Sequence, residues 1–253
     1  MIMKALMKNM GILGITLVSL SACRNDHTQQ TKDSVSVVET KIDTLDTNVE
    51  AKTTLTYPEP DFPTGGTQIE ALVPTNFNID MEVSGDLNKD GLEDKVLVLI
   101  NTRDTTARRP TLVILKVGDA YHVDARSLVV VEPKYREDGY LNYDFEEVQI
   151  DKNGQLIFSQ QSTGPNGSLE SILKYLNNEL VLTNISSFAM GAGGQTELKL
   201  DLKKGIFEQT DINTMKEDMP SKTTTQQYKL PKTLFANSDP RAIMIKAFKD
   251  KGK

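Results

Sequence analysis

Short apolar runs dominate the middle of this chain and limit the folds open to it more than any other feature. Residues 95–100 read KVLVLI and residues 111–117 read TLVILKV, and both runs are rich in Val, Ile and Leu. Such runs are too short for a typical helix and are typical of strands that are buried on both faces. The sequence therefore predicts a mainly β domain.

Further along the chain, turn residues between short strands predict two β-hairpins. The strands at 145–150 and 155–160 flank DKNG, in which Asn-Gly favours the positive φ angles of a tight turn. A second pair, at 168–175 and 180–186, flanks LNNE. Residues 195–202 alternate leucine with charged side chains, as in a strand with one solvent-exposed face. Regular spacing of this kind predicts an antiparallel β-sandwich or a partly open barrel.

The last part of the chain predicts one short helix. After Asp211 the β pattern fades into a stretch rich in Lys, Thr and Gln. Asp239 can cap a helix at about 240–250, and Pro240 is tolerated in its first turn. Met244 and Phe248, one turn apart, are predicted to pack on the sheet.

The N-terminal segment has the features of an export signal. Lys4 and Lys8 precede an apolar stretch that ends at Leu20, and Ser21-Ala22 then leads into Cys23, the only cysteine. A stretch of about a dozen apolar residues is too short to cross a bilayer as a helix, which takes roughly 20. The pattern predicts a secretory signal over residues 1–22.

This arrangement resembles the precursors of bacterial lipoproteins. The resemblance implies cleavage before Cys23, acylation of its thiol and of the new amino terminus, for example with palmitate, and a mature chain held at the membrane by lipid. Because Arg24 rather than Asp follows the cysteine, it also favours the outer membrane over the inner, with the leaflet left open. The alternative for Cys23 is a buried thiol or an uncleaved anchor.

The segment after Cys23 is predicted to be a disordered tether. It is rich in Ser and Thr and closes with Pro58, Pro60 and Pro63, so it cannot bury enough apolar surface to offset its ordering entropy. An amphipathic helix over residues 35–51 is the alternative. The predicted organisation has four parts. They are a signal peptide at 1–22, a lipid-anchored tether at 23–68, a β-rich domain at 69–211, and a C-terminal extension at 212–253 that contains the short helix.

Charge and composition exclude several classes of function. The formal net charge is -6, and it becomes -8 once residues 1–22 and their two lysines are removed. An acidic chain gains nothing from phosphate neutralisation, which argues against a nucleic-acid partner. With Cys23 committed to lipid, no disulfide and no thiolate metal site can form. His27 and His122 are the only histidines, too few for a zinc site without cysteines.

One loop carries a pattern typical of metal binding. Residues 85–94 read GDLNKDGLED, with oxygen-bearing side chains at alternate positions. Calcium takes six to eight oxygen ligands, and a tight loop can wrap it from its first, third, fifth and ninth positions. Gly91 allows the sharp bend that such a loop needs. The predicted ligands of one structural calcium ion are Asp86, Asn88, Asp90, Asp94 and the backbone carbonyl of Leu92.

The loop is not an EF-hand, because its twelfth position is Leu97 instead of a bidentate Glu. The string GDLNKDGLED followed by KVLVLI instead resembles the calcium loops of FG-GAP and VCBS-type repeats, which lead directly into a β-strand. Only one copy is present, so a propeller is not expected. The span from Ala71 to about Asp211 resembles bacterial lipoproteins of unassigned role with a single loop of this form. The alternative is a solvated turn without metal.

Three other motifs do not complete a catalytic or binding set. Residues 188–194 are glycine-rich but lack a P-loop lysine and a following helix, and are predicted to be a flexible connection. Glu146 and Glu147 are adjacent on a strand and point to opposite faces, so they cannot flank one glycosidic bond. Arg108 and Arg109 precede Pro110 in what is predicted to be a solvated turn, and recognition of a carboxylate or sulfate is the alternative.

The leading functional hypothesis is a non-enzymatic, lipid-anchored β-domain of the cell envelope that binds another envelope component, a protein or a glycan. A second hypothesis is an envelope hydrolase acting on polysaccharide or peptide, with carboxylates from residues 135–147 facing each other within about 5 to 10 Å. A third is an immunity or inhibitor protein against a toxin that enters the envelope, which an acidic surface would suit.

Overall fold

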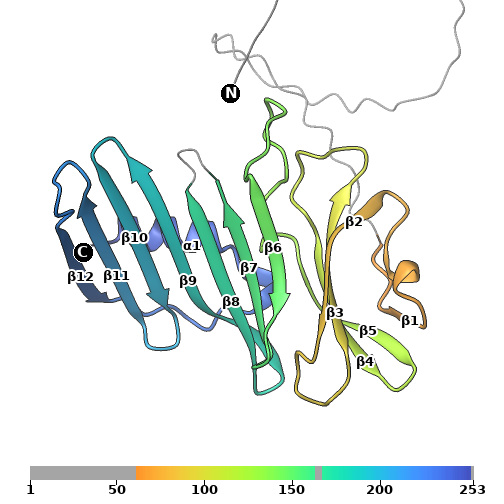
Figure 1. Ribbon diagram of the computed structural model, residues 1–253. Helices are drawn as coiled ribbons and strands as arrows, with labels where there is room; N and C mark the ends of the chain where they lie inside the picture. The colour runs from red at the N-terminus through yellow and green to blue at the C-terminus, as the bar shows by residue number, and fades with distance from the viewer. Residues whose placement is uncertain (1–60, 163–166, 252–253) are drawn as a thin grey trace, which may run out of the picture. The chain divides into compact units, whose positions relative to one another are not determined.

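The computed structural model describes residues 61–162 and 167–251, which form two antiparallel sheets and one α-helix (Figure 1). The five-stranded sheet has the order β1-β5-β4-β3-β2. Its strands are β1 (Gly65–Gly66), β2 (Phe77–Gly85), β3 (Asp94–Asn101), β4 (Thr111–Val117) and β5 (Ala120–Ser127). Helix α1 spans Pro240–Lys249, and 3-10 turns cover Ile69–Leu72 and Phe235–Asn237.

The seven-stranded sheet has the order β12-β11-β10-β9-β8-β7-β6, so each strand pairs with its neighbours in sequence. Its strands are β6 (Phe145–Ile150), β7 (Gln155–Gln161), β8 (Ser168–Leu176), β9 (Glu179–Gly191), β10 (Gly194–Asp201), β11 (Ile206–Asn213) and β12 (Ser221–Gln227). Both predicted hairpins are confirmed. Gly154 has a φ of 68° in the first turn, and Asn177 and Asn178 have φ values of 53° and 62° in the second. Asparagine tolerates this left-handed region better than most residues.

The central strands β3 and β4 of the five-stranded sheet are buried on both faces, which explains their continuous apolar runs. Leu97 and Leu99 on β3 contact a cluster that includes Phe62 from the segment before β1. The alternating residues Val96 and Val98 point to the opposite face and join the core of the seven-stranded sheet. A strand in this position needs an apolar side chain at almost every residue.

The two sheets share one hydrophobic core and meet where β2 passes β6. Gly85 at the end of β2 lies so close to β6 that a Cβ atom there would be 2.8 Å from Cγ2 of Ile150. Glycine at this position therefore allows a close approach of the two strands.

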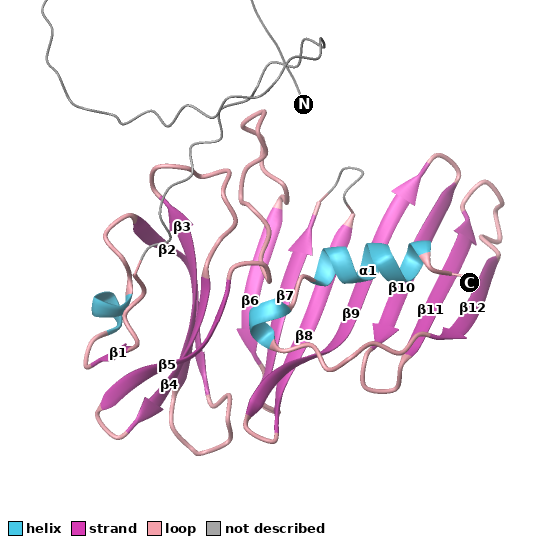
Figure 2. Cartoon of the chain, turned by 180° about the vertical axis from the view of Figure 1, so that it is seen from behind, coloured by secondary structure: helices cyan, strands magenta, loops and turns pink. Residues whose placement is uncertain are grey.

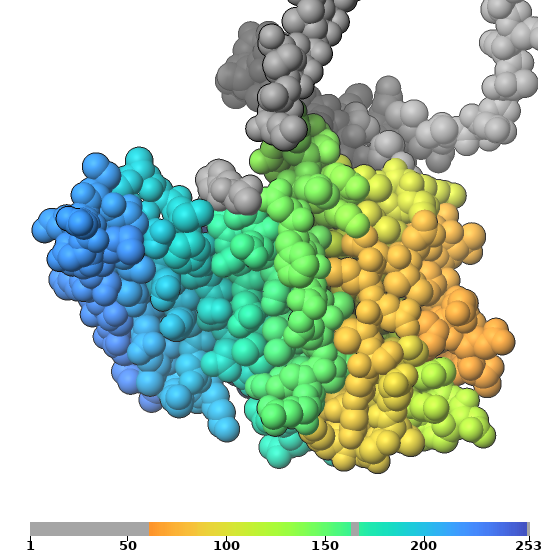
Figure 3. Space-filling view, viewed as in Figure 1, coloured from red at the N-terminus to blue at the C-terminus, as the bar shows by residue number. Residues whose placement is uncertain are grey.

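Helix α1 covers the inner face of the seven-stranded sheet, across β8, β9 and β10 (Figure 2). The predicted N-cap is confirmed, because Oδ1 of Asp239 accepts a hydrogen bond from the backbone N–H of Ala242 at 2.9 Å. Met244 is buried on the sheet as predicted, whereas Phe248 is 45% exposed. The opposite face of the sheet, seen from the front in Figure 3, is not covered by any described element.

The predicted mainly β fold with a short C-terminal helix is confirmed. The two sheets are compatible with a β-sandwich, and within the described residues they do not close into a barrel. Two predicted boundaries differ from the structure. The domain already includes Phe62 and β1, which were predicted to belong to the tether, because Phe62 is buried against Phe77. The extension after Asp211 contains a further strand, β12, whose exposed Thr and Gln residues carry no apolar alternation.

Several predictions concern residues outside the described part of the chain. They are the signal at 1–22, the lipid attachment at Cys23 and the tether from residue 23 to residue 60.

Candidate functional site

The loop between β2 and β3 is built from hydrogen bonds between its own side chains and backbone. The two carboxylate oxygens of Asp86 accept the backbone N–H groups of Asp90 and Gly91, each at 3.1 Å. Asp90 accepts the N–H of Leu92 at 2.8 Å and the side-chain amide of Asn88 at 2.9 Å. Gly91 has a φ of 84°, so the predicted sharp bend is present. These contacts give the loop a defined conformation.

Asp94 anchors this loop inside the domain. Its side chain is fully buried, and Oδ2 accepts the N–H groups of Leu87 and Asn88 while Oδ1 accepts the N–H of Lys116 on β4. Burial raises the pKa of Asp94 above its usual value, although the three N–H groups act in the opposite direction. Asp94 therefore connects the loop to β4, the strand beside β3 in the five-stranded sheet.

The described geometry does not present the predicted calcium ligands as one group. Within residues 61–162 and 167–251, no three Asp, Glu, His or Cys side chains are placed to hold a metal ion together. Asp86 and Asp90 lie towards the surface, but Asp94 is buried and already accepts three N–H groups. Leu92 is 37% exposed. Calcium binding by this loop stays a prediction.

The uncovered face of the seven-stranded sheet contains a hollow of about 370 Å³. Five charged side chains line it. Lys204 pairs with Asp201, and the other three lie in one row across the strands. Lys199 on β10 lies directly opposite Glu208 on β11, and Ser186 separates it from Glu170 on β8. None of the three charged side chains forms an ion pair with another described residue. The hollow therefore offers separated charges of both signs to a ligand.

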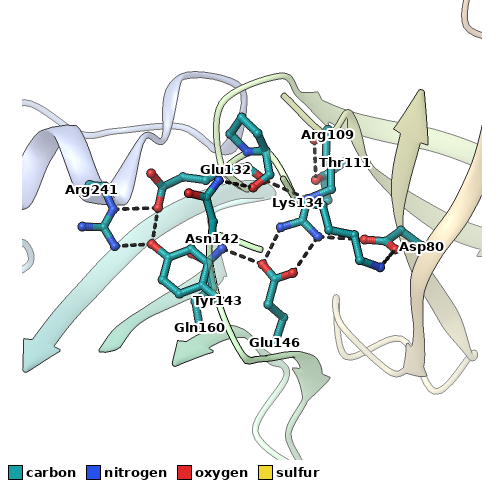
Figure 4. A network of polar contacts seen from close by, with 11 residues as sticks. Asp80, Arg109, Thr111, Glu132, Lys134, Asn142, Tyr143, Glu146, Gln160 and Arg241 are labelled. Carbon is teal, nitrogen blue, oxygen red and sulfur yellow. Dashed lines mark hydrogen bonds and ion pairs between the residues drawn. The ribbon is translucent and has the colours of Figure 1, made fainter. Parts of the chain in front are cut away.

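A second polar cluster lies between the two sheets and centres on Arg109 (Figure 4). The guanidinium is fully buried and donates to two carboxylates, to Oδ2 of Asp80 at 2.7 Å and to both oxygens of Glu146. Asp80 also pairs with Lys134, and Glu146 accepts from Gln160 at 2.9 Å. Asp80 lies in a β-bulge of β2, the kind of irregularity that redirects a side chain.

A second arm extends this cluster to helix α1. Nε of Arg109 donates to the backbone carbonyl of Glu132, whose carboxylate accepts from Nε of Arg241 at 2.6 Å and from the hydroxyl of Tyr143. Arg241 also donates to that hydroxyl and lies over the Tyr143 ring, 5.5 Å from its centroid. The two arms join β2, β6, β7 and α1 through side chains from both sheets.

The Arg109 cluster is arranged as a structural element. The side chains of Asp80 and Glu146 are only 6% and 11% exposed, and each is engaged by Arg109. Among the described residues, no buried side-chain nitrogen or oxygen lacks a hydrogen-bond partner. A buried ion pair of this kind gives little net stability by itself, but removing one partner leaves an uncompensated buried charge.

Sequence reasoning was wrong about Arg109 and right about its neighbour. Arg108 lies in the irregular segment before β4 and is 42% exposed, as predicted for a solvated segment, whereas Arg109 is completely buried. Glu146 and Glu147 point to opposite faces of the sheet, as predicted. Glu146 contacts Arg109 between the two sheets, whereas Glu147 lies opposite Ser159 of β7 on the uncovered face. His122 is an exposed residue of β5. The row of charges on the open face was not predicted, because it depends on the register of four strands.

The chain matches no protein-family model, no curated protein and no solved structure. Among the described helices, none is long and apolar enough to cross a membrane. The function therefore has to be inferred from the residues and the geometry.

Two tyrosines predict a loss of stability at alkaline pH. Burial raises the pKa of Tyr143 and Tyr175, and the hydrogen bonds of their hydroxyls to Glu132 and Asp124 raise it further. An unfolded tyrosine ionises near pH 10. Above that pH the folded protein holds more protons than the unfolded protein, so the free energy of unfolding falls as the pH rises.

Urea unfolding of the full chain at about pH 9 and about pH 11 measures this effect. We expect the double variant Tyr143→Phe/Tyr175→Phe to lose less stability between the two pH values than the unmodified chain. The variant Tyr140→Phe is the control, because Tyr140 is 68% exposed. An equal loss in all three proteins would contradict the assignment.

Proposed function

We propose that this chain is a lipid-anchored, non-enzymatic binding domain of a bacterial cell envelope, with the outer membrane as the favoured location. Cys23 and the residues before it support the anchor. The row of unpaired charges at the hollow of the seven-stranded sheet supports the binding role and is the observation on which it depends. The bound component is another envelope molecule, a protein segment or a glycan.

The hollow suits a polar ligand that carries charges of both signs. Neighbouring strands lie about 4.8 Å apart. Glu170 and Lys199, two strands apart, are therefore separated by about 10 Å, and Glu208 lies one strand further on. Ile172 and Ile206 line the same hollow in the neighbouring row, two residues along the strands from Glu170 and Glu208. A ligand that places cationic groups near both Glu170 and Glu208 and an anionic group near Lys199 would compensate all three.

The hydrolase hypothesis receives less support. It needs two carboxylates within about 5 to 10 Å on opposite sides of an accessible substrate. In the segment expected to supply them, Glu146 pairs with Arg109 between the sheets, and the neighbouring Glu132 pairs with Arg241 and Tyr143. Catalysis by either would first require breaking these contacts.

Affinity capture from envelope extract tests the binding role. The bait is the full chain with Cys23→Ser, which removes the predicted lipid attachment, and captured molecules are identified by mass spectrometry. We expect a partner that is retained by this bait and lost when Lys199→Glu is added, because the row then carries three negative charges.

The matched control is Lys152→Glu, since Lys152 is an exposed lysine in the turn between β6 and β7, away from the hollow. This control makes the same charge change and should retain the partner. Identical capture by all three baits would contradict binding at the hollow.

The loop at residues 86–94 is proposed separately as a weak calcium site. Modules outside the cell bind calcium with a Kd on the order of 1 mM. At about ten times that concentration, binding to the folded state alone adds about 1.4 kcal/mol to the free energy of unfolding. We therefore expect a higher melting temperature in excess calcium than in chelator, and no such difference for Asp86→Asn/Asp90→Asn.

The control for this prediction is Asp151→Asn. Asp151 also accepts backbone N–H groups in a turn, those of Asn153 and Gln155, but lies outside the predicted ligand set. This variant should keep the full response to calcium. Coincident melting curves of the unmodified chain with calcium and with chelator would exclude the metal.

A further inference from the structure

Strand β12 (Ser221–Gln227) forms the outer edge of the seven-stranded sheet, as both ribbon views show (Figures 1 and 2). It pairs with β11 on one side. Within residues 61–162 and 167–251, no strand pairs with its other side. A seven-residue edge of this kind presents a row of backbone donors and acceptors to a further strand.

The hydrogen bonds that flank β12 identify the backbone groups on its outer side. Pro220 accepts from the N–H of Asn213 at 3.0 Å, and Tyr228 donates to Gly205 at 2.8 Å. In an antiparallel pair, residues alternate between bonding to the partner strand and pointing away from it. The even-numbered residues of β12 therefore bond to β11. The residues whose N–H and C=O groups point outward are Ser221, Thr223, Thr225 and Gln227.

The edge has few of the features that usually prevent strand addition. Natural edge strands are commonly protected by charges, by proline or by a bulge. The sequence SKTTTQQ contains no proline, and Lys222 is its only charge. Its pairing with β11 runs through all seven residues without a bulge. Its three consecutive threonines have high β propensity.

We propose that β12 pairs with the β12 of a second copy of this chain, antiparallel and about a two-fold axis at Thr224. In this register Thr223 lies opposite Thr225 of the second copy, and Ser221 lies opposite Gln227. These four are the outward-pointing residues, so every free N–H and C=O of the edge gains a partner. A two-fold axis makes the interface closed and self-complementary.

The side chains are also compatible with this register. Lys222 falls opposite Gln226 of the second copy, so no like charges lie directly opposite each other. The two Lys222 side chains are separated by four residues along the strand direction, about 13 Å. Threonine pairs across strands form favourable contacts. Pairing joins the two seven-stranded sheets into one continuous sheet.

Disulfide formation tests the position of the axis. Thr224 of one copy lies directly opposite Thr224 of the second copy. The two residues form a non-hydrogen-bonded pair with a Cα–Cα separation of about 4.5 Å, which is within the range of a disulfide. In the full chain with Cys23→Ser, kept in mild detergent, we expect Thr224→Cys to form covalent dimers under mild oxidation. Thr225→Cys should crosslink far less, because the two copies of residue 225 are offset by two positions.

Charge changes test the pairing without a disulfide. Thr223→Lys/Thr225→Lys places two lysines opposite each other at two points, and should raise the dimer dissociation constant by about tenfold or more. Thr223→Glu/Thr225→Lys places Glu opposite Lys at both points and should restore the dimer. Both residues are exposed, so the fold of a single copy tolerates the changes.

Sedimentation equilibrium of the full chain measures these dissociation constants. A dimer that responds to the two double variants in opposite directions supports the proposal. A monomer at all concentrations, or a dimer that is indifferent to residues 223 and 225, overturns it. Equal crosslinking through residues 224 and 225 would overturn the proposed register.

Discussion

Replacing Arg109 with methionine is expected to lower the free energy of unfolding by about 3 to 5 kcal/mol. Methionine fills much of the volume of the arginine, but it leaves the carboxylate of Glu146 buried without a cation and leaves Lys134 as the only cation beside the buried Asp80. It also removes the hydrogen bond from Nε of Arg109 to the backbone carbonyl of Glu132. This hydrogen bond joins the two arms of the cluster. Urea unfolding followed by far-UV circular dichroism measures the loss.

The neighbouring arginine provides a matched control. Arg108 pairs with Asp239 at 2.9 Å but is 42% exposed, so Arg108→Met should cost no more than about 1 kcal/mol. Adding Glu146→Gln to Arg109→Met should recover part of the loss, because the carboxylate left without a cation is then neutral. A loss of the same size from Arg108→Met and Arg109→Met would contradict a special role for the buried cluster.

Replacing Asp94 with alanine is expected to cost about 2 to 4 kcal/mol, even in chelator. The carboxylate is fully buried and accepts N–H groups from Leu87, Asn88 and Lys116. Hydrogen bonds to a charged group contribute about 1.5 to 3 kcal/mol each, and their loss is less than additive when they share one acceptor. The change should also free the loop between β2 and β3 from β4.

Asp90→Ala separates this structural role from calcium binding. Asp90 belongs to the same predicted ligand set but is exposed, and its partners are loop residues. In chelator, Asp90→Ala should therefore cost less than Asp94→Ala, by about 1 kcal/mol or more. Unfolding curves of the two variants in chelator measure this difference. Equal losses would mean that Asp94 does not anchor the loop.

The fold was predictable wherever a single strand, turn or helix has its own local pattern of apolar, polar or turn-forming residues. The runs at residues 95–100 and 111–117 predicted strands, and the structure buries both of their faces. DKNG predicted a tight turn because Asn-Gly favours positive φ, and Gly154 has a φ of 68°. Strand β12 was missed because an edge strand exposed on both faces needs no apolar pattern. Phe62 was missed because a single aromatic residue among prolines carries no periodic signal.

The polar sites were harder to predict because they depend on contacts between distant segments. Arg109 meets Asp80 and Glu146, which lie 29 and 37 residues away in sequence. Its role depends on a bulge in β2 that no local pattern announces. Asp94 was predicted to be a metal ligand from its spacing, and the structure adds a contact to Lys116, 22 residues away. The spacing of acidic residues alone does not distinguish these two roles.

Lipid attachment at Cys23 underlies the proposed location and role of the domain, and the intact mass of the protein extracted from bacterial membranes tests it most directly. We expect a chain that begins at Cys23 and carries the added mass of acyl groups, and we expect Cys23→Ser to leave the chain uncleaved and without that mass. A membrane-extracted protein that begins at Met1, or one that begins elsewhere and keeps a free Cys23 thiol, would contradict the lipid anchor.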